Sequence, residues 1–119
     1  MYNIFIMKYT KRKGTLWERQ IMKHLAKLGY YVTRSRGSFG LFDVWAFHPY
    51  NGVLLLIQAK RTSKDFIYVD SNLKKANEFA RKLVERGFNH VKVQLWVRLV
   101  KHRKTKVVDL PFEGSKISL

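Results

Sequence analysis

Glu18 is an acid placed inside an apolar helical pattern. The apolar residues of this stretch are Trp17, Ile21, Met22, Leu25 and Leu28. At about 100° per residue these side chains fill one arc of a helix, and Glu18 falls inside that arc. An ionised carboxylate that points at a core is costly unless a metal ion, a lysine or an arginine satisfies it. Glu18 is therefore a functional acid, an acid at the wet edge of a wide arc, or half of a structural pair with an arginine.

Three further polar residues interrupt or end strand-like patterns. Asp43 stands within the apolar run 41–47, and aspartate is a poor strand former. It is either a functional acid or an acid that caps a turn at the end of a strand. Gln58 and Lys60 end the next apolar run and lie two residues apart, so both side chains leave the same face of that strand. This pattern indicates an anion or a metal beyond the strand, or a strand that has reached solvent.

Together these residues predict a metal-dependent site. An acid on one hairpin strand and an amide and a lysine on the next strand can converge in space. Asp43 and Gln58 would supply oxygen ligands of the kind that Mg²⁺ prefers, and Glu18 would complete the site from the helix. Lys60 would polarise a water molecule or steady the charge on a phosphate. We therefore expect phosphodiester hydrolysis, with water activated by the metal attacking in line.

Two amphipathic helices are predicted from apolar residues at helical spacing. The first spans about residues 15–28 and is capped at residues 14–15. The second spans about residues 72–86 and is capped by Asp70 or Ser71. Its inner stripe is expected to consist of Leu73, Ala76, Ala80, Leu83 and Val84.

Strands are predicted over residues 30–33, 41–47, 53–60, 91–100 and 104–110. The Asn-Gly pair at 51–52 predicts a hairpin turn, and the apolar run of the third strand indicates burial on both faces. This order of elements predicts an α/β fold with a mixed central sheet flanked by helices, as a single domain over residues 1–119. Residues 1–10 are expected to be a flexible arm. Residues 2–7 form a short edge strand in one alternative, and in another the first six residues precede a start at Met7. Residues 111–119 are expected to be a tail.

The charge of the chain points to a polyanionic partner. Twenty-four Lys and Arg residues against eight Asp and Glu residues give a net charge of +16. Nucleic acid is the first candidate for the partner, an anionic membrane surface is the lesser one, and a ribosomal-type or packaging protein is the non-enzymatic alternative. The absence of cysteine excludes disulfides and thiolate zinc sites and fits a reducing cytoplasm. No long apolar run and no nucleotide fingerprint is present, so we expect no membrane span and no small-molecule cofactor. The four histidines share no spacing, so we expect no histidine metal site.

Basic residues flank each proposed catalytic position. Lys11, Arg12 and Lys13 precede Glu18, Arg34 and Arg36 precede Asp43, and Arg61 and Lys64 follow Lys60. This placement predicts that these side chains bind DNA phosphates and lead them to the metal. The alternative is a general solvated coat of charge.

The motifs resemble those of a known family. Residues 11–19, with the pattern basic-Gly-x-x-x-Glu-Arg, resemble the opening of the archaeal-type, Hjc-like Holliday junction resolvases. Residues 29–34 are similar to their helix-to-strand step, and Asp43 with Gln58-Ala59-Lys60 resembles the PD-(D/E)xK nuclease core. The resemblance covers residues 11–60 well and continues more loosely through the second helix and the long strand.

The resemblance implies a restriction-endonuclease-like fold and a homodimer that cuts four-way DNA junctions. Cleavage would depend on Mg²⁺ or Mn²⁺ and would leave paired symmetric nicks. The expected location is the cytoplasm, or the host cytoplasm if the gene is viral. Glu18, Asp43 and Lys60 take the family's catalytic positions, and Ser38 takes the position of its loop serine. Candidate interface residues are Phe39, Leu41, Trp45, Trp96 and Phe112.

Two positions depart from the family pattern. Phe42 stands where the family has proline, and Gln58 stands where it has a carboxylate. A neutral amide binds a divalent cation less tightly, so either metal affinity falls or Glu18 carries more weight. The Gln-x-Lys motif also resembles Mrr-type restriction nucleases, which keeps a restriction or repair nuclease acting on duplex DNA as an alternative. A degenerate protein that only binds nucleic acid is the third hypothesis. The short chain favours the junction resolvase because it has no room for a separate recognition domain.

Overall fold

The computed structural model describes residues 2–35 and 40–119, with side chains from Thr15 onward within these ranges. The elements in chain order are α1 (Tyr2–Lys27), β1 (Tyr31–Arg34), β2 (Val44–Phe47), β3 (Leu54–Thr62), β4 (Phe66–Tyr68), α2 (Ser71–Glu85), β5 (Val91–Leu99), β6 (Lys104–Leu110) and β7 (Lys116–Ser118). No helix in these ranges is long and apolar enough to span a bilayer.

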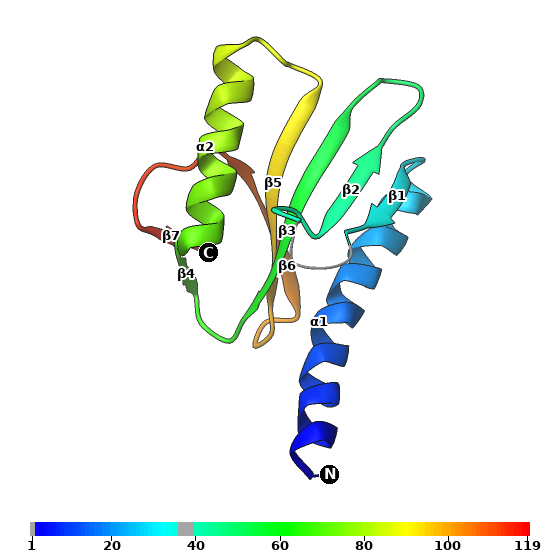
Figure 1. The fold of residues 1–119 in the computed structure, drawn as a ribbon, viewed down its shortest axis with the longest axis vertical. Coiled ribbons are helices and arrows are strands. Elements are labelled where there is room, and N and C mark those ends of the chain that lie inside the picture. Colours follow the sequence, from blue (N-terminus) through cyan, green and yellow to red (C-terminus); the bar gives the residue numbers. More distant parts are fainter. Residues whose placement is uncertain (1, 36–39) are drawn as a thin grey trace.

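A mixed sheet in the order β1-β2-β3-β5-β6 forms the centre of the domain (Figure 1). Strands β3 and β5 pair in parallel, and every other neighbouring pair in this sheet is antiparallel. Helix α1 packs on β1, β2 and β3, whereas α2 packs on β5 and β6. The predicted α/β fold with a mixed sheet flanked by helices is confirmed.

Each helix covers a separate hydrophobic core on the sheet. Under α1, the buried residues are Trp17, Ile21, Leu25, Val44, Ala46, Leu55, Ile57 and Trp96. Under α2 they include Leu56, Leu73, Ala76, Ala80, Val93, Leu95 and Val97. Strand β3 contributes alternate residues to both cores, so the predicted burial of this strand on both faces is confirmed.

The predicted start of the first helix was wrong. Helix α1 begins at Tyr2 and continues through Gly14, where a cap was expected. Glycine in a helix interior costs only about 1 kcal/mol relative to alanine, so one glycine does not end a helix of this length. The N-terminal part of α1 extends past the end of the sheet (Figure 1), so residues 2–7 are helical and not an edge strand. Leu28 lies beyond the helix and is exposed.

The strand predicted over residues 41–47 is shorter. Strand β2 begins at Val44, so Asp43 stands immediately before the strand and not within it. The second helix agrees closely with its prediction, because Asp70 is its N-cap and its side chain accepts a hydrogen bond from the backbone N–H of Leu73. Val84 does not belong to the inner stripe, because its side chain is 68% exposed.

The segment expected to be a tail contains a strand. Strand β7 pairs antiparallel with β4, which lies in the connection 61–69 that had no predicted structure. Ile117 of β7 and Ile67 of β4 face each other in this pairing, and both are buried in the core under α2. The chain end therefore forms part of the fold.

Candidate functional site

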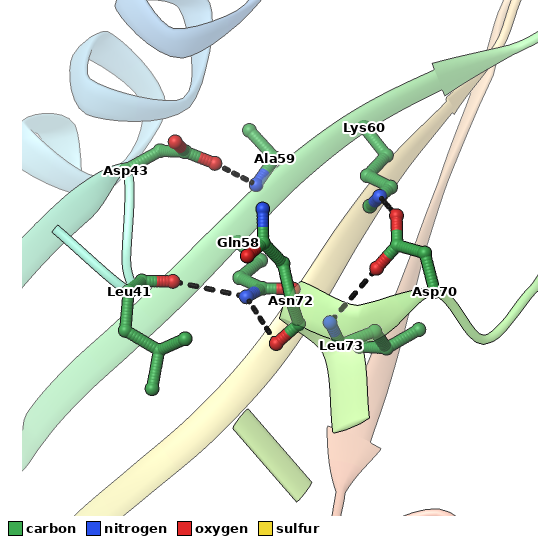
Figure 2. A network of polar contacts seen from close by, with 8 residues as sticks. All are labelled: Leu41, Asp43, Gln58, Ala59, Lys60, Asp70, Asn72 and Leu73. Atoms are coloured by element: carbon green, nitrogen blue, oxygen red, sulfur yellow. Dashed lines mark hydrogen bonds and ion pairs between the residues drawn. The ribbon is translucent and has the colours of Figure 1, made fainter. Parts of the chain in front are cut away.

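Asp43 is fixed against the middle of β3. Its Oδ2 accepts a hydrogen bond from the backbone N–H of Ala59 at 2.8 Å (Figure 2). Its own N–H donates to the carbonyl of Ile57 at 2.8 Å, and its carbonyl accepts from the N–H of Ser35 at 3.1 Å. The backbone of Asp43 is thus held by β3 on one side and by the residue that follows β1 on the other, which fixes the direction of its carboxylate.

Burial raises the pKa of Asp43 above the usual aspartate range. The Ala59 N–H and the charges of Lys60 and Arg34 oppose this rise without cancelling it. The pKa of Glu18 is also raised, first by burial and then by the negative charge of Asp43, and Arg34 opposes both effects. Two partly buried carboxylates therefore act on each other in a group that also contains two cationic side chains.

Glu18 forms an ion pair with Arg34. The distance between Arg34 Nε and Glu18 Oε2 is 3.0 Å, although this N–H is not aligned for a hydrogen bond. One of the three interpretations of Glu18, pairing with an arginine, is therefore present in the structure, and its role as a functional acid stays a prediction. Arg34, which the sequence assigns to DNA binding, holds a carboxylate of the candidate site and keeps part of its side chain exposed.

Gln58 is a buried cross-link between two segments. Its Nε2 donates to the carbonyl of Leu41 at 2.9 Å and to the carbonyl of Asn72 at 3.2 Å (Figure 2). The side chain is 4% exposed, and its Oε1 has no hydrogen-bond partner among the residues that the structure describes. The idea that the strand simply reaches solvent at Gln58 was wrong. These two hydrogen bonds tie the segment before Asp43 to the first turn of α2. A carboxylate at this position has no N–H group and could donate neither of them.

Lys60 pairs with an acid that the sequence did not assign to the site. Its Nζ binds Asp70 Oδ2, while Asp70 Oδ1 accepts from the Leu73 N–H at 2.9 Å (Figure 2). Burial by itself would raise the pKa of Asp70, but its bonds with Lys60 and with Leu73 N–H leave that pKa below the usual range. Sequence reasoning predicted Asp70 as a cap. The only signal for its second role is that this cap follows the strand carrying Lys60.

Of the remaining predicted residues, the structure describes the side chains of some and not of others. Arg36 and Ser38 lie outside the described residues, and Lys11, Arg12 and Lys13 lie in α1 where no side chains are described. Arg61 is exposed at the C-terminal end of β3, next to Arg98 of β5. Lys64 Nζ lies 5.5 Å from the centre of the Phe66 ring.

The donor set fits a hard divalent cation. Asp43 and Glu18 are carboxylates that repel each other, and a cation between them would relieve this repulsion. Within the described ranges, the Oε1 of Gln58 is a buried oxygen without a hydrogen-bond partner, and few buried polar groups in folded proteins lack one. Among the described residues no group of three or more His, Asp or Glu side chains could hold a metal, so the amide oxygen of Gln58 is the candidate for a further ligand from the protein.

Comparisons with known proteins agree with this architecture. The family model of archaeal Holliday junction resolvases (hjc) matches residues 9–110. A search of curated proteins found no significant match. A solved structure of Hjc from Archaeoglobus fulgidus, described as a Holliday junction resolvase from an archaeal hyperthermophile, matches with a TM-score of 0.60 at 19% identity. The match covers 84% of this chain and 86% of that chain, and at this identity it supports the fold.

Proposed function

The chain belongs to the archaeal Holliday junction resolvase family, and on this premise we propose that it resolves four-way DNA junctions by metal-dependent phosphodiester hydrolysis. The family does not favour the alternative of a nuclease for linear duplex. The observation that carries the chemistry is the group of Glu18, Asp43 and Lys60. Two partly buried carboxylates with raised pKa and a lysine lie around one segment of β3.

Each residue has a distinct part in this proposal. Asp43, Glu18 and the Oε1 of Gln58 would hold Mg²⁺ or Mn²⁺, which when bound supplies a Lewis acid for in-line hydrolysis. The Ala59 N–H orients Asp43, and Arg34 holds Glu18. Lys60 would steady the negative charge that builds up on the phosphate, and Asp70 fixes the position of its side chain.

We also propose that the protein acts as a homodimer, because a two-fold dimer matches the symmetry of a four-way junction. Of the interface candidates, Leu41, Trp96 and Phe112 pack in the cores, and Phe39 lies outside the described residues. Trp45 is 41% exposed and shares with Tyr31 and Phe47 a face of β1 and β2 that α1 does not cover. An apolar groove of about 300 Å³ lies at these strands.

The dimer is tested by sedimentation of the wild type and Trp45→Glu. We expect a dimer that the substitution converts to a folded monomer, with Tyr50→Glu in the exposed turn as the control. A dimer that survives Trp45→Glu would place the interface elsewhere.

The activity is tested on a synthetic four-way junction, a linear duplex of the same sequence and a single strand. Each substrate is incubated with Mg²⁺, Mn²⁺ or EDTA, and Asp43→Asn serves as the site variant. We expect paired cuts in the junction alone, dependent on metal and lost in the variant. Tight junction binding without cuts in either metal would contradict the proposal and favour a protein that only binds DNA. Cleavage of the linear duplex at a similar rate would favour a restriction or repair nuclease.

A further inference from the structure

Two arginines stand side by side on the face of the sheet that carries α1. Arg61 of β3 and Arg98 of β5 are register partners in the parallel pair. Neighbouring strands are about 4.8 Å apart. Alternate residues of the same strands, Ile57 on β3 and Trp96 on β5, are buried under α1, so both arginines project on that side.

The two side chains line a pocket beside α1. Its volume is about 230 Å³, and it is lined by Leu16, Trp17, Gln20, Arg61 and Arg98. The guanidinium carbon of Arg98 lies 6.0 Å from the Trp17 ring centre, and its Nη1 donates to Thr105 Oγ1 at 3.4 Å. Arg98 is therefore partly held in place before any ligand arrives, whereas Arg61 is exposed.

Neither guanidinium is neutralised within the described part of the chain. All eight acidic residues lie in that part, and the acids that form ion pairs do so with Arg34, Lys60, Arg81 and His102. Two adjacent positive charges without a counter-charge repel each other and attract an anion. Guanidinium groups match phosphate oxygens with two parallel hydrogen bonds, and the Gln20 amide adds a further donor at the wall of the pocket.

We propose that this pocket binds a backbone phosphate of DNA, next to the phosphate that is cut. Trp17 precedes Glu18 on α1, and Arg61 lies two residues beyond Ala59, about 7 Å along the strand. Ala59 is the residue that holds Asp43, so the pocket flanks the candidate catalytic site on the α1 side. The choice of DNA as the source of the phosphate rests on the proposed function. The phosphate chemistry itself does not depend on cleavage.

The test measures binding of the full protein to a four-way junction and to a linear duplex in EDTA, so that no cleavage occurs. Affinity is measured between about 50 and 200 mM salt, because each phosphate contact contributes about 0.9 to the slope of log K against log salt. The variants are Arg98→Gln, Arg61→Gln, the double variant and the charge-preserving Arg98→Lys. Lys92→Gln is the matched control, because Lys92 is exposed on the same strand and face about 20 Å away.

We expect Arg98→Gln to lower the slope by about 0.9 and Lys92→Gln to leave it unchanged. The double variant should lose less than the sum of the two single variants, because both arginines bind one phosphate. Arg98→Lys should keep most of the slope, which separates lost charge from lost packing against Trp17. Equal slopes for Arg98→Gln and Lys92→Gln, or strictly additive losses, would overturn the shared site.

A separate arm distinguishes DNA from free phosphate. Inorganic phosphate is titrated into the wild type and Arg98→Gln at constant ionic strength. Binding that differs between the two, with an unchanged DNA slope, would assign the pocket to free anions and overturn the proposal. If the wild type cuts no junction but Arg98→Gln still lowers the salt slope of DNA binding, the proposed function is contradicted and the phosphate pocket is supported.

Discussion

The side-chain nitrogen of Lys60 is bound by the carboxylate of Asp70, the residue that also caps α2. One oxygen of this carboxylate faces the lysine and the other accepts from the Leu73 N–H. The same charge of Lys60 lowers the pKa of Asp43, so the lysine lies within electrostatic reach of both acids. The start of α2 therefore fixes a cation beside the candidate metal site.

Asp70→Asn should separate the two roles of this residue. Asparagine caps a helix about as well as aspartate, so Asp70→Asn should lose only the stability that the charge of Asp70 contributes at neutral pH, and below the usual aspartate pKa it should match the wild type in free energy of unfolding. Asp70→Ala should lower it by about 1 kcal/mol through loss of the cap. Both variants release Lys60, so we expect junction cleavage to fall by roughly tenfold, which corresponds to about 1.4 kcal/mol of activation free energy.

Chemical denaturation and single-turnover cleavage measure these two effects. Since the pKa of Asp70 is lowered by folding, its contribution to stability is present above the usual aspartate pKa of about 4 and is lost as the pH falls below it. Glu78→Gln, on the same helix, is the control. Unchanged cleavage in Asp70→Asn would show that Lys60 needs no partner.

Arg34→Gln should move the pH dependence of metal binding upward. Arg34 lowers the pKa of both Glu18 and Asp43, so without it both acids hold their protons to higher pH. A carboxylate must lose its proton to bind a cation, so binding of Mg²⁺ should begin at higher pH in this variant. The measurement is the Mg²⁺-induced rise in melting temperature at a series of pH values without DNA. Arg34→Lys should restore most of the wild-type profile, and identical profiles for all three proteins would contradict the prediction.

Much of this fold follows from the sequence because its periodicity is local. Strands β5 and β6 and helix α2 carry clear apolar patterns, and the predicted cap Asp70 is the observed one. Strands β4 and β7 have three residues each and gain their stability from pairing with each other across the chain, which no local pattern contains. The start of α1 was missed because Gly14 resembles a cap but lies within the helix.

The sequence indicates which residues are candidates for the site, but it does not indicate which groups each of them contacts. The spacing of Gln58 and Lys60 placed them on one face, but their partners come from other segments. Leu41 and Asn72 offer backbone carbonyls, whose direction depends on the folded chain and not on residue type. The pairing of Glu18 with Arg34 likewise required α1 to dock on β1.

Mg²⁺ should raise the free energy of unfolding of the wild type by an amount that depends on the ratio of its concentration to its dissociation constant. At a hundredfold excess over its dissociation constant, a ligand of the folded state adds about 2.7 kcal/mol to the free energy of unfolding. Asp43→Asn and Glu18→Gln should lose most of this gain, and Glu85→Gln at the far end of α2 should keep it. In EDTA, Asp43→Asn should be more stable than the wild type at neutral pH, because burial raises the pKa of Asp43 and its charge opposes folding above its usual pKa. An equal response to Mg²⁺ in all four proteins would place the cation elsewhere.

Gln58→Glu should lower the stability of the fold and raise the affinity for Mg²⁺. Glutamate cannot donate to the carbonyls of Leu41 and Asn72, and each buried polar group left unpaired costs about 1–3 kcal/mol. In EDTA the variant should therefore be clearly less stable than the wild type. The new carboxylate would stand where the Oε1 of Gln58 meets no hydrogen-bond donor of the described part of the chain, so added Mg²⁺ should stabilise the variant more than it stabilises the wild type.

Gln58→Met is the matched control, because it also removes both donors but adds no charge. It should show the loss of stability in EDTA without the larger response to Mg²⁺. If both variants respond to Mg²⁺ like the wild type, Gln58 acts only as the link between the segment before Asp43 and α2. In that case the metal would depend on Asp43 and Glu18 alone, and glutamine at this position would be a structural substitution that leaves the cation with fewer ligands from the protein.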